Sequence, residues 1–146
     1  MDITSGPFDV IWDITYACPL RCIHCYSESG RRPSRQLPTA ELSRVADALI
    51  AMRPGAIALA GGEPLIVPEL LEIAGRMAAA GIQVVLYTGG WPVKEHRADD
   101  LLRVFSQINV SVDGATAEVH DRIRGRAGSF DRAVAALTML DAAAAR

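Results

Sequence analysis

Two hydrophobic periods alternate along the chain, and the alternation repeats four times. Residues 10–16 place β-branched and aromatic side chains at every second position, which predicts a first strand. Short apolar runs predict three further strands over residues 56–60, 82–87 and 108–112. Because residues 56–60 are all apolar, we expect that strand to be covered on both faces.

A helical period separates these strands. In the segment that begins at residue 39, apolar residues recur at the spacing of one buried helix face: Leu42, Val45, Ala46, Leu49 and Ile50. The pattern predicts further helices over residues 68–80, within 97–105, over 116–122 and over 129–144. Thr39 and Ser129 stand at helix starts, where we expect their hydroxyl groups to act as N-caps.

The alternation of strands and helices predicts an α/β fold of parallel strands joined by right-handed crossovers. Both a doubly wound sheet and a (β/α) barrel have this pattern. The fingerprint G-x-G-x-x-G is absent after the first strand. The unusual residues all follow strand carboxyl ends, where barrel enzymes assemble their sites. We therefore predict a partial (β/α) barrel with four βα units.

Size and composition favour one domain over residues 1–146, since 50% of the residues are hydrophobic. The net charge of −2 and the isoelectric point near 5.9 give no basic footprint for nucleic acid. The N-terminus has no pattern of a secretory signal, and no segment approaches the roughly 20 apolar residues that span a bilayer. We therefore expect a cytoplasmic protein without a membrane or nucleic-acid partner.

All three cysteines lie in the loop after the first predicted strand, in the spacing C-x3-C-x2-C: Cys18, Cys22 and Cys25. Thiolate ligands select iron–sulfur clusters, zinc and Cu(I). A four-iron cluster with three cysteine ligands keeps one iron open, and an open position distinguishes catalytic from structural metal sites. The alternatives are a zinc site with His24 as fourth ligand and unrelated buried thiols. A disulfide would use only two of the three cysteines.

The spacing C-x3-C-x2-C after a first strand resembles the signature of the radical S-adenosylmethionine (SAM) enzymes. The resemblance implies that these cysteines hold a [4Fe–4S] cluster whose open iron chelates the amino and carboxylate groups of SAM. One electron from the cluster then cleaves SAM to a 5′-deoxyadenosyl radical, which abstracts hydrogen from the substrate. The resemblance also implies a one-electron donor such as a flavodoxin or ferredoxin. It assigns no residue of this chain as catalytic.

Further motifs follow in the order of that family. Residues Gly61, Gly62, Glu63 and Pro64 resemble its GGEP motif, whose glycines approach the cofactor and whose acidic region receives the amino group. An ordinary glycine turn before a helix is the alternative. Thr88 matches a polar position after the third strand, although Gly89 replaces the asparagine found in many members.

The fourth predicted strand ends in Ser111 and Asp113, at positions that hydrogen-bond the ribose in the family, although Asp113 and Gly114 could equally form a turn. Residues 120–125 and 128–131 resemble the run H-D-x-x-R-G…G-S-F-D of members that modify peptides or build cofactors. There Arg124 matches the arginine that pairs with the SAM carboxylate. His24 occupies a position that is often aromatic, which implies stacking near the adenine.

Two regions bear on the substrate. The polar segment with Arg31, Arg32 and Arg35 is either a solvated loop or a segment that binds an anionic substrate.

The family usually has six βα units, and members of this group carry a cysteine-rich extension; neither the last units nor further cysteines are present here. We therefore expect a core domain that is truncated at its C-terminus, either as a fragment or as one half of a barrel that a second chain completes.

Two functions follow from these patterns. The first is a radical SAM enzyme, or its N-terminal half, that acts on a peptide or a small-molecule cofactor precursor such as a haem. The second is a non-catalytic metal-binding domain. It would be either a degenerate relative or a zinc protein with three cysteines and one histidine.

Overall fold

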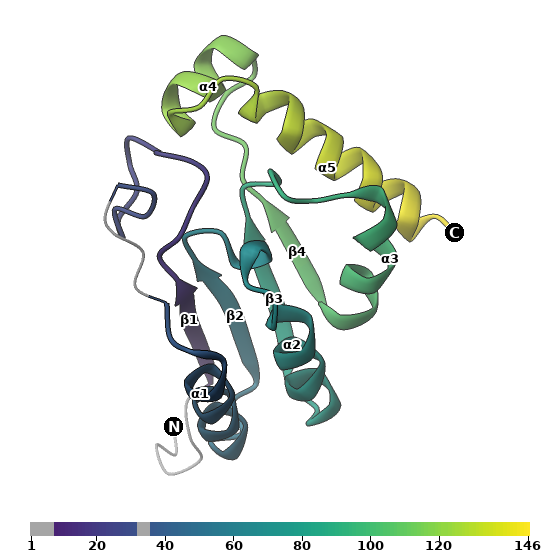
Figure 1. Ribbon diagram of the computed structural model, residues 1–146. Coiled ribbons are helices and arrows are strands. Elements are labelled where there is room, and N and C mark those ends of the chain that lie inside the picture. Colours follow the sequence, from purple (N-terminus) through teal and green to yellow (C-terminus); the bar gives the residue numbers. More distant parts are fainter. Residues whose placement is uncertain (1–7, 32–35) are drawn as a thin grey trace.

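The computed structural model describes residues 8–31 and 36–146 and contains one parallel sheet with helices against it (Figure 1). The strands are β1 (Asp9–Thr15), β2 (Ala56–Gly61), β3 (Gln83–Thr88) and β4 (Gln107–Val110). They lie in the order β1-β2-β3-β4, and each neighbouring pair is parallel. The four predicted strands are confirmed, with bounds that differ by one or two residues.

Within residues 8–31 and 36–146, five α-helices and one short 3-10 helix connect and follow these strands. They are α1 (Thr39–Ala51), η2 (Pro64–Ile66), α2 (Leu70–Ala79), α3 (Glu95–Val104), α4 (Ala117–Arg124) and α5 (Ser129–Ala144). The five predicted helices are confirmed, and α4 extends two residues beyond its predicted end. In the part of the chain that the structure describes, no helix is long and apolar enough to cross a membrane.

The strand order decides between the two architectures that the sequence left open. A doubly wound sheet needs a point at which the strand order reverses, and the described sheet has none. Right-handed crossovers between strands in sequential order place their helices on one face. Figure 1 shows α1 and α2 in front of the sheet in this way. The chain therefore forms the wall of a partial (β/α) barrel, as predicted.

The core lies between the sheet and the helices. Alternate residues of the central strands, such as Leu59 and Leu86, are fully buried there. On the opposite face Ile11 is 72% exposed and Tyr87 is 47% exposed. The prediction that β2 is covered on both faces is wrong for the described residues, because a singly wound sheet receives helices on one face only.

Both predicted N-caps are wrong. The side chain of Thr39 makes no capping bond in α1, and its hydroxyl donates instead to Glu69 at 2.5 Å. The start of α5 is capped by Asp121 from α4, whose carboxylate accepts from the backbone N–H groups of Gly128 and Phe130 at 2.6 and 2.8 Å. The hydroxyl of Ser129 donates to the same carboxylate at 2.9 Å. This cap fixes α4 against the start of α5.

Candidate functional site

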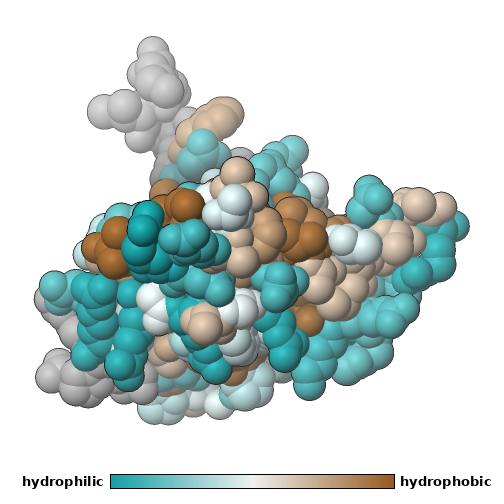
Figure 2. Space-filling model, turned by 90° about the horizontal axis from the view of Figure 1, so that it is seen from above, coloured by the Kyte–Doolittle hydropathy of each residue, from teal (hydrophilic) through white to brown (hydrophobic). Residues whose placement is uncertain are grey.

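A cavity of about 430 Å³ opens at the carboxyl end of the sheet, among the loops that follow the four strands. Its lining includes nine of the predicted site residues: Cys18, Cys22, Cys25, His24, Gly61, Gly62, Glu63, Ser111 and Arg124. Pro64 and Asp113 are outside the lining. Figure 2 looks onto this end of the molecule, where apolar and polar side chains lie next to each other.

All three cysteines are free thiols that contribute to the cavity wall. Each sulfur has a polar neighbour. The backbone N–H of Leu20 donates to Sγ of Cys18 at 3.4 Å, and Oγ of Ser27 lies 3.4 Å from Sγ of Cys25. Nη1 of Arg124 donates to Sγ of Cys22 at 3.5 Å. Hydrogen bonds to sulfur stabilise thiolates and set the potentials of iron–sulfur clusters.

The protonation of the thiols differs along the loop. Burial raises the pKa of Cys18 to about 11. At Cys25 burial also acts to raise the pKa, but hydrogen bonds from Ser27 and neighbouring backbone groups outweigh it and lower the pKa. Because metals bind the thiolate form, Cys25 is the readier ligand of these two.

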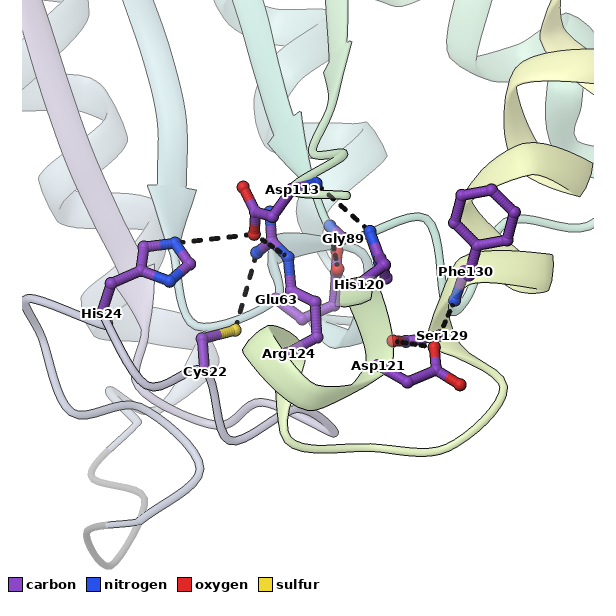
Figure 3. A network of polar contacts seen from close by, with 10 residues as sticks. All are labelled: Cys22, His24, Glu63, Gly89, Asp113, His120, Asp121, Arg124, Ser129 and Phe130. Carbon is purple, nitrogen blue, oxygen red and sulfur yellow. Dashed lines mark hydrogen bonds and ion pairs between the residues drawn. The ribbon is translucent and has the colours of Figure 1, made fainter. Parts of the chain in front are cut away.

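The described residues show no preformed site for a single metal ion, either at the three cysteines alone or at the three cysteines with His24. In residues 8–31 and 36–146, no group of three or more His, Cys, Asp or Glu side chains stands close enough together to hold one metal ion. His24 faces Asp113 instead, with Nε2 3.6 Å from Oδ2 (Figure 3).

The glycines after β2 allow that loop to contact the backbone that leads into the cysteines. A Cβ atom on Gly62 would lie 2.2 Å from the carbonyl oxygen of Ala17. Gly61 has φ +115°, and a Cβ atom there would lie 2.4 Å from the carbonyl oxygen of Thr15. The backbone N–H of Glu63 donates to Ala17 at 2.9 Å. These glycines thus join the β2 loop to the base of the cysteine loop.

Glu63 is the buried carboxylate of the cavity. Oγ1 of Thr88 donates to its two oxygens at 2.8 and 2.9 Å, and the backbone N–H groups of Gly89 and Leu65 donate at 2.9 and 3.2 Å. Burial raises the pKa of Glu63, whereas these donors act to lower it. The role of Thr88 as a donor to Glu63 was not predictable from its own motif. Pro64 is buried and begins η2, which orients Glu63.

Arg124 reaches the cavity from the last turn of α4. Its Nε lies 2.6 Å from Oδ2 of Asp113, but the N–H does not point at that oxygen, so the contact is an ion pair without an aligned hydrogen bond (Figure 3). Both atoms are buried and have no hydrogen-bond partner among the described residues. The backbone N–H of Asp113 donates to Nδ1 of His120 at 3.2 Å. Burial, and then the charge of Arg124, lower the pKa of His120, which favours the neutral ring.

The donor set fits the groups that the sequence implies. Three thiols with polar neighbours suit an iron–sulfur cluster. A cavity of this volume accepts a small organic molecule. Glu63 offers a carboxylate for an ammonium group, and Arg124 offers a planar guanidinium for a carboxylate. Nε of Arg124 and Oδ2 of Asp113 face each other as an ion pair, which orients the guanidinium beside the cavity.

Near the cavity, one contact joins two residues for which the sequence predicted no role. Tyr26 donates through its hydroxyl to the carboxylate of Asp13 at 2.8 and 3.0 Å. Burial and this hydrogen bond raise the pKa of Tyr26 to about 12. The period of two already placed Asp13 on the open face of β1. Arg31 is exposed and donates to the carbonyl of Arg21, while Arg32 and Arg35 lie outside the described residues.

A parallel half-barrel with a three-cysteine loop beside a cavity for a small polar ligand defines a class of cofactor-binding enzyme domains. The family model described as "Radical SAM superfamily" matches residues 12–144. The chain belongs to this family. Members of the family use a [4Fe–4S] cluster and SAM, and the donor set of the cavity fits both.

The relatives of this chain include a maturase and a heme synthase. The chain is 39% identical over 140 residues to the mycofactocin maturase MftC of Mycobacterium tuberculosis (strain ATCC 25618 / H37Rv), covering 95% of this chain and 36% of the relative. It is 36% identical over 140 residues to the AdoMet-dependent heme synthase of Methanosarcina barkeri (strain Fusaro / DSM 804), covering 94% and 40%. The chain therefore spans little more than a third of the length of these relatives.

A solved structure shows the same fold. The crystal structure of Streptococcus suis SuiB bound to S-adenosylmethionine superposes with a TM-score of 0.78 at 15% sequence identity, covering 96% of this chain and 32% of that one. The fold of this chain is therefore shared with part of a much longer chain.

Proposed function

We propose that residues 1–146 are the cluster- and SAM-binding core of a radical SAM enzyme that modifies a peptide or a cofactor precursor. One observation supports this most directly. Three free cysteines of a single loop line the same cavity as a buried carboxylate and a nearly buried guanidinium, Glu63 and Arg124. In the proposal, Cys18, Cys22 and Cys25 hold a [4Fe–4S] cluster. When bound, the cluster supplies the electron that splits SAM and so starts hydrogen abstraction from the substrate.

The chain's own residues then bind and orient SAM. Three donors face the carboxyl group of Glu63 and act against the burial that raises its pKa, and we assign this group to the ammonium group of SAM, beside the backbone of Gly61 and Gly62. Pro64 acts indirectly, by fixing Glu63 at the start of η2. We assign the SAM carboxylate to the guanidinium of Arg124, which Asp113 contacts at Nε and Cys22 contacts at Nη1.

The other end of SAM has its own proposed contacts. Ser111 lines the cavity at the end of β4, and Asp113 lies just behind it; we assign both to the ribose hydroxyls. His24 lines the cavity with its ring partly exposed, and we assign it to the adenine. Ile11, Leu20 and Tyr87 add apolar side chains to the lining of the cavity.

A peptide is the favoured substrate, because a maturase is among the relatives that match nearly the whole chain. A haem precursor is second, since a heme synthase matches over the same length. The whole enzyme needs a one-electron donor such as a flavodoxin or ferredoxin. It also needs chain beyond these four βα units, from the same polypeptide or a second subunit, to close the barrel. We place it in the cytoplasm, where reduced thiols persist.

Anaerobic reconstitution with iron and sulfide tests this function. We expect four irons per chain, a brown protein and, after reduction, SAM-dependent release of 5′-deoxyadenosine. Each of the variants Cys18→Ala, Cys22→Ala and Cys25→Ala should lose the cluster. The control is Thr138→Ala, since that exposed hydroxyl bonds only to Val134 within its own helix. One tightly bound zinc per chain without this release, or a full cluster in Cys22→Ala, would refute the assignment.

A further inference from the structure

The segment between the cysteines rests on the end of α4. The backbone N–H of Arg21 donates to the carbonyl of Arg124 at 3.0 Å, and that of Ile23 donates to the carbonyl of Ile123 at 2.9 Å. The last carbonyls of a helix have no partner within the helix. The cysteine loop therefore supplies the hydrogen bonds that complete α4, over a separation of about a hundred residues.

Gly125 makes this contact possible. It follows α4 with φ +67°, in the left-handed region that glycine favours. A Cβ atom there would lie only 2.4 Å from the carbonyl oxygen of Arg21. Gly81 follows α2 one residue later, after Ala80, also with a positive φ of +82°, but a Cβ atom there would meet nothing within 4 Å. The two glycines thus share a backbone conformation and differ in their contact with another segment.

Arg126 holds the loop from a second direction. Its Nη1 donates to the carbonyl of Pro19 at 2.7 Å, and its guanidinium lies 3.7 Å from the ring centroid of Trp91, in the loop after β3. The helix that carries these contacts, α4, is itself held in place. His120 accepts from the backbone of Asp113, and Asp121 caps α5, so α4 cannot move independently of β4 and α5.

We propose that residues 123–126, here called the α4 terminal segment, position the cysteine loop for metal binding. In this arrangement Gly125 is a positioning residue, because it touches the loop backbone between Cys18 and Cys22 and no reacting atom. The backbone N–H groups of Arg21 and Ile23, which lie between the cysteines, bond to α4, whereas the backbone N–H groups that bond to backbone carbonyls within the loop belong to Cys25 and later residues. The placement of Cys18 and Cys22 relative to each other therefore depends on the contact with α4. The inference rests on the proposed cluster.

A pair of matched variants tests it, Gly125→Asn and Gly81→Asn. Asparagine adopts the left-handed conformation more readily than other residues with a Cβ atom, so both variants keep their turns. Only at position 125 does the new Cβ atom press on the cysteine loop. We expect Gly81→Asn to bind four irons per chain after anaerobic reconstitution. Gly125→Asn should bind less than half of that, or show an altered EPR spectrum of the reduced cluster.

The melting temperature of each metal-free chain shows whether the fold survives the substitution. We expect similar melting temperatures for the two variants, because the contact of Gly125 serves the loop rather than the core. If Gly125→Asn does not fold, Arg126→Gln replaces it. That variant removes the guanidinium contacts with Pro19 of the loop and with the Trp91 ring, and it should lose iron to a chelator several-fold faster than the wild type.

The outcomes separate the two proposals. A wild-type chain that takes up no cluster would refute the proposed function itself. A wild-type chain that takes up four irons, together with a Gly125→Asn chain of the same iron content and the same EPR spectrum, would refute the role of the α4 terminal segment. So would an unfolded Gly125→Asn chain combined with an unchanged rate of iron loss in Arg126→Gln.

Discussion

The hydroxyl of Thr88 lies at the centre of a buried group of hydrogen bonds. It donates to both oxygens of Glu63 and accepts from the backbone N–H of Gly90 at 3.0 Å, and all of these atoms are buried. Thr88→Val keeps the shape and the branched Cβ atom but removes the hydroxyl. Glu63 then retains only the two backbone donors from Gly89 and Leu65.

The size of the effect follows from these contacts. A hydrogen bond to a charged group contributes about 1.5–3 kcal/mol, and leaving the buried N–H of Gly90 without an acceptor costs roughly 1 kcal/mol more. We therefore expect Thr88→Val to lower the free energy of unfolding by about 2–4 kcal/mol. For a chain of 146 residues this corresponds to a fall of about 6–12 °C in melting temperature.

The loss of unfolding free energy in Thr88→Val should also depend on pH. Thr88 is the strongest of the donors that act against the raised pKa of Glu63, so its removal raises the pKa of that carboxyl further. A carboxyl group whose pKa is raised in the folded state weakens stability as the pH rises above its ordinary value, because the unfolded chain then ionises first. The deficit of Thr88→Val should therefore grow as the pH rises through the raised folded-state pKa of Glu63, and it should be smaller at pH 4 than at pH 8.

Urea unfolding at both pH values measures the change, and Thr88→Ser is the control because it keeps the hydroxyl. We expect Thr88→Ser to retain most of the wild-type stability and its pH dependence. A Thr88→Val chain within 0.5 kcal/mol of the wild type at pH 8 would show that the bond to Glu63 contributes little and that the reasoning is wrong.

Two further predictions concern the fold. Hydrogen bonds from Phe130, Gly128 and Ser129 lower the pKa of Asp121, so the stability they give is present above its ordinary value of 3.8 and is lost as the pH falls through the lowered value. The difference in melting temperature between the wild type and Asp121→Asn should be constant from pH 5 to pH 8 and shrink below pH 3.8; a difference that persists at pH 2 would contradict this. Leu59→Ala, in the buried face of β2, should cost about 2–5 kcal/mol in urea unfolding, whereas Ile11→Ala on the exposed face should stay within about 0.5 kcal/mol. Equal losses would mean that the two faces of the sheet are wrongly assigned.

The sequence by itself determined the elements and the position of the chemistry. A period of two and a helical period are local properties, so the strands and helices could be read from neighbouring residues, and the cysteines necessarily followed the first strand. Because the strands are parallel, all their carboxyl ends meet at one edge. This placed Glu63 and Ser111 near the cysteines, whereas Arg124, at the end of a helix, was expected there only from the family resemblance.

Only the tertiary structure decided which residues support that site. The order of the strands excluded a doubly wound sheet, and the cap of α5 came from Asp121 rather than from Ser129, the residue at the helix start. The bond between Thr88 and Glu63 and the contact of Gly125 with Arg21 join segments that are far apart in the sequence. Such contacts depend on how the elements pack, and no local pattern of side chains records which distant backbone group will lie within hydrogen-bonding distance.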